Sequence, residues 1–160
     1  MSNLRTLIFA AALGAAAPAF AEEKPVDPYT QSNANAGGTP FTGEQMLAAF
    51  NGREGVARIV DHTLDRSVAD PRLTDIFRAT DMERLRRTLK EQVAYLLGAP
   101  VDYTGRDMKT THKDQGINTA EFNILVEHMQ LAMDKEGVAY RHQNQLLAKL
   151  APMKRDVVTR

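Results

Sequence analysis

The sequence predicts an all-α domain, and three observations support this prediction. Helix-forming residues such as Leu, Ala, Met, Glu, Lys, Gln and Arg dominate a chain of 160 residues that is 43% apolar and 25% charged. Apolar residues recur every three or four positions over most of the chain, which is the spacing of one helix face. No stretch alternates apolar and polar residues as a half-buried strand does. We therefore expect one helical domain without internal repeats.

The N-terminus has the composition of an export signal. Arg5 precedes an apolar stretch, and Ala19-Phe20-Ala21 stands just before the acidic Glu22. This order matches the charged start, apolar core and small-x-small cleavage site of a signal peptide. The apolar core is shorter than the roughly 20 residues of a membrane span. The alternative, a short buried helix, leaves the cleavage pattern unexplained. We predict that residues 1–21 are removed and that the product is periplasmic or secreted.

Two parts of different composition follow the signal. Residues 22–40 are rich in Pro, Gly, Asn and Ser and lack apolar periodicity, so they predict a flexible leader. Residues 41–160 form the helical domain. In it, Thr42-x-x-Gln45 resembles a capping box of a short helix that ends near Phe50, where Asn51-Gly52 breaks the pattern.

The next two helices are predicted on either side of a proline. The first has one apolar face, formed by Val56, Ile59, Val60, Thr63, Leu64, Ser67 and Val68. Asp70-Pro71, an N-cap followed by proline in the first turn, then begins a short helix through Phe77.

A second capping box, Thr80-x-x-Glu83, opens a helix that Gly98 and Pro100 end. Its apolar side consists of Met82, Leu85, Leu89, Val93 and Leu96. The sequence predicts a loop over residues 99–105 and a short helix over residues 106–114, which Gly116 ends.

Two helices complete the predicted domain. Asn118-x-x-Glu121 caps a long helix that reaches Gly137. Its apolar side carries Phe122, Leu125, Val126, Met129, Ala132 and Met133. In the last helix, which carries Leu146, Leu147, Leu150 and Met153, Pro152 is expected to produce a kink.

The composition excludes several classes of function. Lys+Arg and Asp+Glu both number 20, so no surplus of positive charge is available for binding nucleic acid. Cysteine is absent, which excludes disulfides, cysteine-ligated zinc, iron–sulfur clusters, a thiol nucleophile and thioether-linked haem. The chain has no Gly-rich phosphate loop and no recognisable Ser/His/Asp spacing.

The four histidines carry the remaining chemical information. No two of them have the spacing of a two-histidine zinc site. His62, His128 and His142 are expected at the surface or at a helix boundary. His112 shares a helix face with Met108, four residues earlier. On spacing alone, His112 is more commonly a core histidine, but haem supplies four nitrogens and needs only one axial ligand from the protein.

Several segments together resemble a known family. They are ADPRL…F, LGxPxxYTGRDM…H and the closing LAP…DVV, which occur in family order between about Phe50 and Val158. On these segments the chain resembles the group 1 truncated haemoglobins, the two-over-two helical globins. The resemblance implies a two-over-two helical sandwich that holds non-covalent haem b, with its iron five-coordinate and open to oxygen, carbon monoxide or nitric oxide.

The resemblance also implies the site residues. It makes His112 the proximal iron ligand, Phe77 the residue that packs on the haem edge, and Arg84 a partner for a haem propionate. The distal side would be lined by Met82, Leu85 and Leu89, and the proximal side by Met108, Thr111, Ile117 and Phe122.

Two departures from the family concern the distal side. Leu64 stands where the family usually has a tyrosine, and Leu85 and Leu89 stand where it commonly has glutamines. Leucine donates no hydrogen bond to a polar gas ligand. The sequence therefore predicts fast oxygen release and a preference for carbon monoxide.

Other functions remain open at this point. One is an exported electron-transfer or haem-carrier protein, and another is a helical adaptor without a cofactor. Nitric-oxide dioxygenation would require a separate reductase as a partner, because the chain has no flavin or nicotinamide motif. Weak peroxidase activity would require a distal acid or base, which the distal leucines do not supply.

Overall fold

Every secondary-structure element in residues 22–160, the part of the chain that the computed structural model describes, is a helix. This confirms the all-α prediction. The predicted export signal, residues 1–21, lies outside the described residues. Within the described part, no helix combines the length and the apolar character that crossing a bilayer requires.

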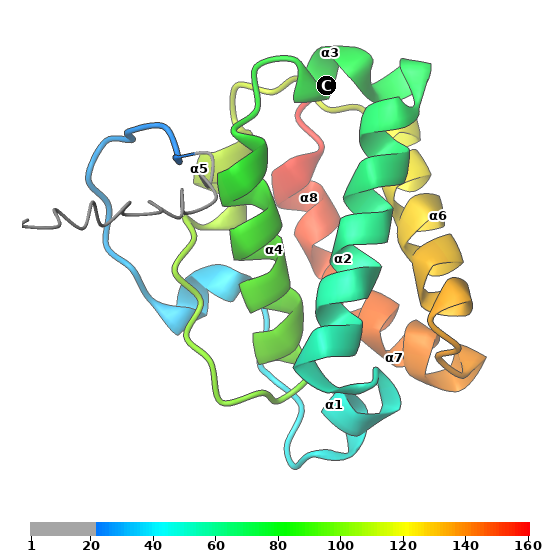
Figure 1. The fold of residues 1–160 in the computed structure, drawn as a ribbon. Helices are drawn as coiled ribbons and strands as arrows, with labels where there is room; N and C mark the ends of the chain where they lie inside the picture. The colour runs from blue at the N-terminus through cyan, green and yellow to red at the C-terminus, as the bar shows by residue number, and fades with distance from the viewer. Residues whose placement is uncertain (1–21) are drawn as a thin grey trace, which may run out of the picture.

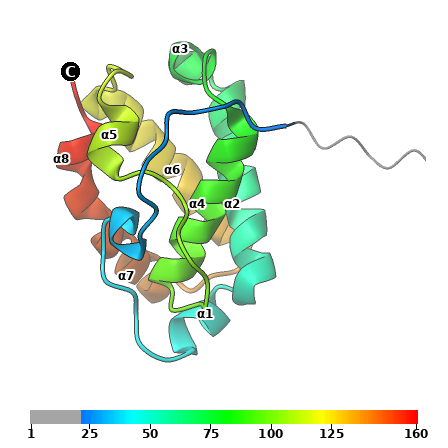
Figure 2. The same cartoon turned by 90° about the vertical axis from the view of Figure 1, so that its left-hand side faces the viewer.

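The helices form two layers. Helix α2 (Gly52–Ala69) packs against α4 (Met82–Leu96) in one layer and against α6 (Thr119–Lys135) in the other. Figure 2 shows α2 and α4 on one side of the molecule and α5, α6, α7 and α8 on the other. The core lies between the layers and is built from apolar residues of α2, α4, α6 and α7 (Tyr140–Leu150).

Helix α2 begins with two residues in the left-handed conformation. Asn51 and Gly52 have φ angles of 59° and 69°, and Asn51 is the one non-glycine residue with positive φ in the described part of the chain. The predicted apolar face is buried from Val56 to Ser67. Val68 is an exception because it is 46% exposed. It follows Ser67 by about 100° around the helix, which turns it out of the interface.

Two of the predicted capping boxes are wrong. Helix α1 (Gln45–Ala49) begins after Glu44 without a side-chain cap from Thr42. Helix α4 is capped by Asp81, whose Oδ1 accepts a hydrogen bond from the Arg84 amide at 3.1 Å. An aspartate directly before the helix can reach that amide, whereas the hydroxyl of Thr80 donates backwards to a carbonyl of the preceding turn.

The starts of two further helices follow the predicted signals, whereas the helix predicted over residues 106–114 covers only Met108–His112. Asp70 caps the 3-10 helix η2 (Pro71–Leu73), which continues into α3 (Thr74–Phe77). The capping box at the start of α6 is complete, because Asn118 and Glu121 each accept from the other's amide, at 2.9 and 2.8 Å.

The C-terminal helix is interrupted where the proline predicts it. Helix α7 gives way to the 3-10 helix η3 (Ala151–Met153), which contains Pro152, and then to α8 (Lys154–Val157). Helix α8 packs against α5 (Met108–His112). Figure 1 shows α5 on the side of α4 that faces away from α6, and α8 between α4 and α2 in that view.

Residues 22–40, for which the sequence predicts a flexible leader, contact the helical domain in the structure. Their backbone is irregular apart from the 3-10 helix η1 (Asn33–Ala36), as the composition predicts. However, this segment is attached to the domain by many hydrogen bonds, including one of 2.9 Å from Gln92 Nε2 to the Ala36 carbonyl. These bonds join side chains to distant backbone groups, and sequence periodicity carries no signal for them.

Candidate functional site

His112 lies at the end of the short helix α5. The helix starts at Asp107, whose carboxylate accepts a hydrogen bond from the Thr110 amide at 2.9 Å. The His112 Nδ1 atom is 2.7 Å from the Met108 carbonyl oxygen. Because a carbonyl only accepts, Nδ1 carries the proton, and the lone pair of the neutral ring is on Nε2.

The surroundings of His112 favour its neutral form. The side chain is half-buried. Burial lowers the pKa of His112 below its ordinary value, and the Met108 carbonyl opposes this shift only in part. A neutral imidazole whose second nitrogen is held by a backbone carbonyl is the form in which histidine binds metals.

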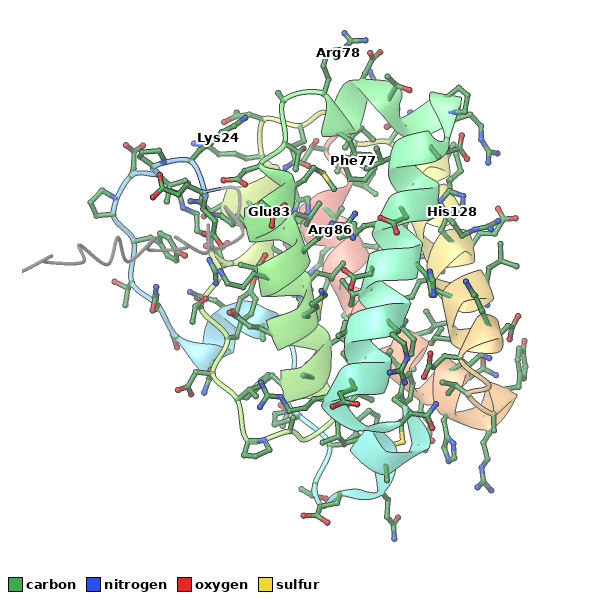
Figure 3. The ribbon with its side chains drawn as sticks, in the orientation of Figure 1. Lys24, Phe77, Arg78, Glu83, Arg86 and His128 are labelled. Atoms are coloured by element: carbon green, nitrogen blue, oxygen red, sulfur yellow. The ribbon has the colours of Figure 1, made fainter. Side chains whose placement is uncertain are left out.

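The predicted distal residues all belong to the core cluster or pack against it. Leu64 is fully buried in the core beneath them. Phe77, Met82, Leu85 and Leu89 are half-buried and pack against the core cluster that contains Leu64. Figure 3 shows Phe77 beneath α3, near the first turns of α4. Leu64 therefore belongs to the core, and the other four side chains form a partly exposed apolar layer over it.

The predicted proximal residues are grouped less completely. Met108 and Phe122 are half-buried, and Ile117 is buried between them in sequence, on the turn that joins α5 to α6. Thr111, in contrast, is exposed, which does not fit a lining position. Thr111 directly precedes His112, and consecutive residues of a helix point about 100° apart. Thr111 therefore lies on the exposed side of α5.

Several polar side chains close in sequence to the distal leucines donate hydrogen bonds to backbone carbonyls. The hydroxyls of Thr63 and Thr88 donate to the carbonyl oxygens four residues earlier, at 2.7 and 2.9 Å. The hydroxyl of Ser67 donates in the same way at 2.7 Å. The side-chain amide of Gln92, which lies on α4, donates to the carbonyl of Ala36, the last residue of η1. Each of these four side chains therefore already donates a hydrogen bond within the protein.

Arg84 has other partners than the predicted propionate. Its Nε is 3.3 Å from Glu23 Oε2, and its Nη1 is 3.5 Å from Asp81 Oδ2. It also donates to the Lys24 carbonyl. Arg84 would have to exchange one of these partners to hold a carboxylate of a cofactor.

The other histidines do not point to a second site. His128 is buried, whereas the sequence predicts a boundary or surface position. Its burial is possible because both ring nitrogens have polar neighbours: Nδ1 lies 2.9 Å from Ser67 Oγ, and Nε2 lies 3.4 Å from Asp70 Oδ2. His62 and His142 are half-buried rather than fully exposed. The sequence gives no signal for the Ser67–His128–Asp70 group, which joins α2 to α6. Ser67 is fully buried, so a substrate cannot reach its hydroxyl.

The side chains that could bind a metal ion fit haem better than a free ion. Residues 22–160 contain no cluster of three or more His, Cys, Asp or Glu side chains that could hold a metal ion by themselves. One neutral imidazole beside an apolar surface suits an iron that already has four ligands from a porphyrin. The apolar side chains of α4 and the nitrogen of His112 therefore fit haem better than a free metal ion.

Two surface hollows offer no competing site for a large apolar ligand. One, of about 360 Å³, is lined by residues that include Arg66, Asp70 and His128. The other, of about 780 Å³, lies between α2 and α4 and is lined by residues that include Arg87 and Lys90. Both linings are strongly charged, whereas sites for flat organic cofactors are mainly apolar.

Comparison with known proteins identifies relatives of this chain. Residues 46–159 match the family model described as "Bacterial-like globin". The Group 1 truncated hemoglobin GlbN of Mycolicibacterium paratuberculosis is 32% identical over 110 residues, which cover 69% of this chain and 81% of the relative.

Solved structures agree with the helical architecture. The truncated hemoglobin of Tetrahymena pyriformis in its Fe(III) form superimposes with a TM-score of 0.68 at 21% identity, over 72% of this chain and 98% of that one. The 2/2 hemoglobin of Synechococcus sp. PCC 7002, in the cyanomet state and with covalently attached heme, gives a TM-score of 0.65 at 21% identity over the same shares. The two-over-two arrangement of helices is therefore confirmed.

Proposed function

This chain belongs to the bacterial-like globins and to the group 1 truncated haemoglobins, and we propose that it binds one haem b and takes a diatomic gas as its ligand. The observation that carries this proposal is the position of His112 on α5, with Nδ1 held at 2.7 Å by the Met108 carbonyl. Haem, when bound, supplies an iron atom with one axial position for a protein ligand and one for a small gas molecule.

His112 would hold the iron through Nε2. The hydrogen bond from Nδ1 to the Met108 carbonyl fixes the tautomer and the orientation of the ring. The apolar side chains of Phe77, Met82, Leu85 and Leu89 would cover the haem face opposite His112 and exclude water from it. Each of these contributions comes from a side chain that is half-buried, as expected for the wall of a site rather than for the core.

We propose that the haem is held without a covalent bond. The chain has no cysteine for a thioether link. A histidine on the last helix could link a haem vinyl group in some relatives, but the position that would correspond here is near Met153. His142, the histidine of that helix, lies 11 residues earlier, about three turns away.

The distal wall supports a five-coordinate iron. Leu64, Leu85 and Leu89 carry no atom that binds iron, and the donors beside them are committed to backbone carbonyls. The second axial position would therefore remain free for the gas. The distal side chains would hold the bound gas by apolar packing, without a hydrogen bond to it. Such a site favours carbon monoxide over oxygen, because bound oxygen gains much more than bound carbon monoxide from a hydrogen-bond donor.

The test of this function is a titration of the haem-free chain with haem, followed by its absorption spectrum. We expect saturation at one equivalent and a five-coordinate ferrous spectrum that shifts when carbon monoxide is added. A chain that takes up no haem at a defined ratio would contradict the proposal. A six-coordinate ferrous spectrum without added ligand would instead favour electron transfer or haem transport.

We further propose that residues 1–21 direct export of the chain, on the strength of the signal pattern that ends at Ala21. Mass spectrometry of the protein from a bacterial periplasm tests this. A mature chain that starts at Glu22 is expected, and soluble haem-loaded protein that retains Met1 would contradict it.

A further inference from the structure

Residues 22–36, which we call the strap, run across one side of the molecule. Figure 2 shows this blue segment passing over the face formed by α4 and α5 before it reaches η1. The strap is hydrogen-bonded to α4 on one side and to the loop that leads into α5 on the other. It therefore connects the two elements that would lie on opposite faces of the haem.

The first anchor of the strap is an ion-pair cluster on α4. Glu23 lies between two arginines, with Oε1 2.5 Å from Arg87 Nε and Oε2 3.3 Å from Arg84 Nε. The amide of Lys24 donates to Asp81 Oδ2 at 2.7 Å. The side chains of Glu23, Arg84 and Arg87 are 29%, 22% and 40% exposed. Partly exposed pairs of this kind hold a segment in place but release it readily.

The second anchor lies on residues 102–106, just before α5. The hydroxyl of Tyr29 donates to the Thr104 carbonyl at 2.6 Å, and Arg106 donates to the Asp27 carbonyl at 2.7 Å. The guanidinium of Arg106 also lies over the Tyr29 ring, 5.0 Å from its centre. This anchor fixes the strap to the segment that carries His112.

The end of the strap is attached to both sides again. Asn33 accepts a hydrogen bond from the Tyr103 amide at 2.7 Å. The Ala36 carbonyl accepts from Gln92 on α4 at 2.9 Å, and the same amide is 3.5 Å from the sulfur of Met108 on α5. From Glu23 to Ala36, the strap thus alternates between the two walls.

We propose that the strap is a gate for the cofactor, and that haem enters and leaves only when the strap has detached from its anchors. The proposal rests on the proposed function, since it takes α4 and α5 as the walls of the haem site. The rigid haem can pass between α4 and α5 only if these helices separate or if the strap that connects them moves aside. The first two anchors of the strap are exposed or partly exposed contacts, whereas its end at Ala36 is buried. Release of the first two anchors is therefore easier than the separation of α4 from the core.

A gate has a kinetic signature that a wall lacks. Weakening the anchors of a gate raises the rates of haem entry and haem exit by the same factor and leaves the affinity nearly unchanged. Weakening a wall that contacts the bound haem raises the exit rate alone. The two rates together therefore separate the two roles.

The experiment uses the full mature chain with three substitutions. Glu23→Gln removes the ion pairs with Arg84 and Arg87, and Tyr29→Phe removes the hydroxyl of the second anchor while keeping its ring. Glu22→Gln is the matched control, because Glu22 is exposed and makes no hydrogen bond or ion pair with another described residue. Exit is measured as transfer of haem to excess apomyoglobin, and entry as stopped-flow binding of haem to the haem-free chain.

We expect Glu23→Gln and Tyr29→Phe each to raise both rates roughly three- to tenfold, as expected for loss of one or two partly buried contacts. Glu22→Gln should match the unmodified protein. In the haem-free chain, hydrogen exchange at the Lys24 amide should be faster in Glu23→Gln than in Glu22→Gln.

Two results would overturn the gate and leave the proposed function intact. One is that the rates of haem entry and exit in Glu23→Gln and Tyr29→Phe equal those of Glu22→Gln. The other is that only the exit rate rises in these two variants. Failure of the unmodified chain to bind haem would overturn the proposed function itself.

Discussion

The two walls of the proposed haem site, α4 and α5, are built in different ways. Helix α4 has 15 residues, an aspartate cap and an apolar side that packs against α2 and the core. Helix α5 has five residues, of which none is fully buried. A helix of five residues does not form by itself, because its nucleation costs more than its few hydrogen bonds return. Helix α5 therefore depends on its contacts with α8, on Asp107 and on the strap.

The walls also differ in what they offer chemically. Helix α5 presents one nitrogen with a fixed tautomer. Helix α4 presents leucines, and its nearby polar groups donate to carbonyls instead of to a ligand. One wall would bind the iron and the other would only shape the space for the gas, so changes to each wall should alter different properties.

The largest effect is expected from removing the nitrogen of the α5 wall. His112→Gly should abolish stable haem binding, because no other described side chain replaces the axial ligand, and added imidazole should restore it. The Soret absorption of purified protein measures this. His62→Ala and His142→Ala are the controls and should keep the Soret band. Loss of haem in either control, with His112→Gly unaffected, would overturn the assignment.

A smaller effect is expected from adding a donor to the distal side. Leu64→Tyr should slow oxygen dissociation roughly 10- to 150-fold, which corresponds to about 1.5–3 kcal/mol for a hydrogen bond to a charged group. Carbon monoxide dissociation should change much less, because carbon monoxide is less polar when bound. Flash photolysis and stopped-flow mixing measure both rates.

Leu64→Phe is the matched control for this substitution, since it adds the ring without the hydroxyl. Equal oxygen rates in the two variants would mean that the residue at this position does not face the ligand. A slow oxygen dissociation rate in the unmodified protein would mean that an unidentified donor reaches the gas.

A third substitution lies outside both walls. His128→Ala should lower the free energy of unfolding by about 1–3 kcal/mol, because it removes a buried partner of Ser67 and Asp70 between α2 and α6. The visible spectrum of the haem protein should stay the same. Urea unfolding measures the stability, with His142→Ala as the control. An altered iron spectrum in His128→Ala would show that the α2–α6 contact is coupled to the walls.

The smallest effect concerns an ion pair at the far end of α2 and α6. A hydrogen bond from Arg58 lowers the pKa of Glu136 to about 2. A carboxylate with a lowered pKa stabilises the fold above its ordinary pKa of 4.5, and this contribution is lost as the pH falls toward 2. The urea midpoints of the unmodified protein and Glu136→Gln should therefore differ slightly at pH 6, differ less at pH 3 and converge near pH 2. A difference that is constant over this range would exclude a role for the charge.

Much of the longer helices could be predicted from the sequence. The spacing of Leu85, Leu89 and Val93 gives the apolar side of α4, and the Asn118–Glu121 box gives the start of α6. Such features are local, so neighbouring residues determine them. Pro152 likewise interrupts the last helix where the lack of a backbone donor requires it.

The features that the sequence did not predict depend on distant residues. Nothing near Glu23 indicates that Arg84 and Arg87 lie beside it, and nothing near Ser67 indicates His128. The hydrogen bond of His112 to Met108 is local, but its meaning depends on the wall that faces it. Polar contacts between segments far apart in the sequence have no periodicity, and only the structure reveals them.

The most direct test of the central claim is the resonance Raman spectrum of the ferrous protein prepared with ¹⁵N-labelled histidine. If His112 Nε2 binds the iron, an iron–nitrogen stretching band shifts with the label. The same band is then absent in His112→Gly and returns with added imidazole. A band that does not move with the label, or one that persists unchanged in His112→Gly, would contradict the account.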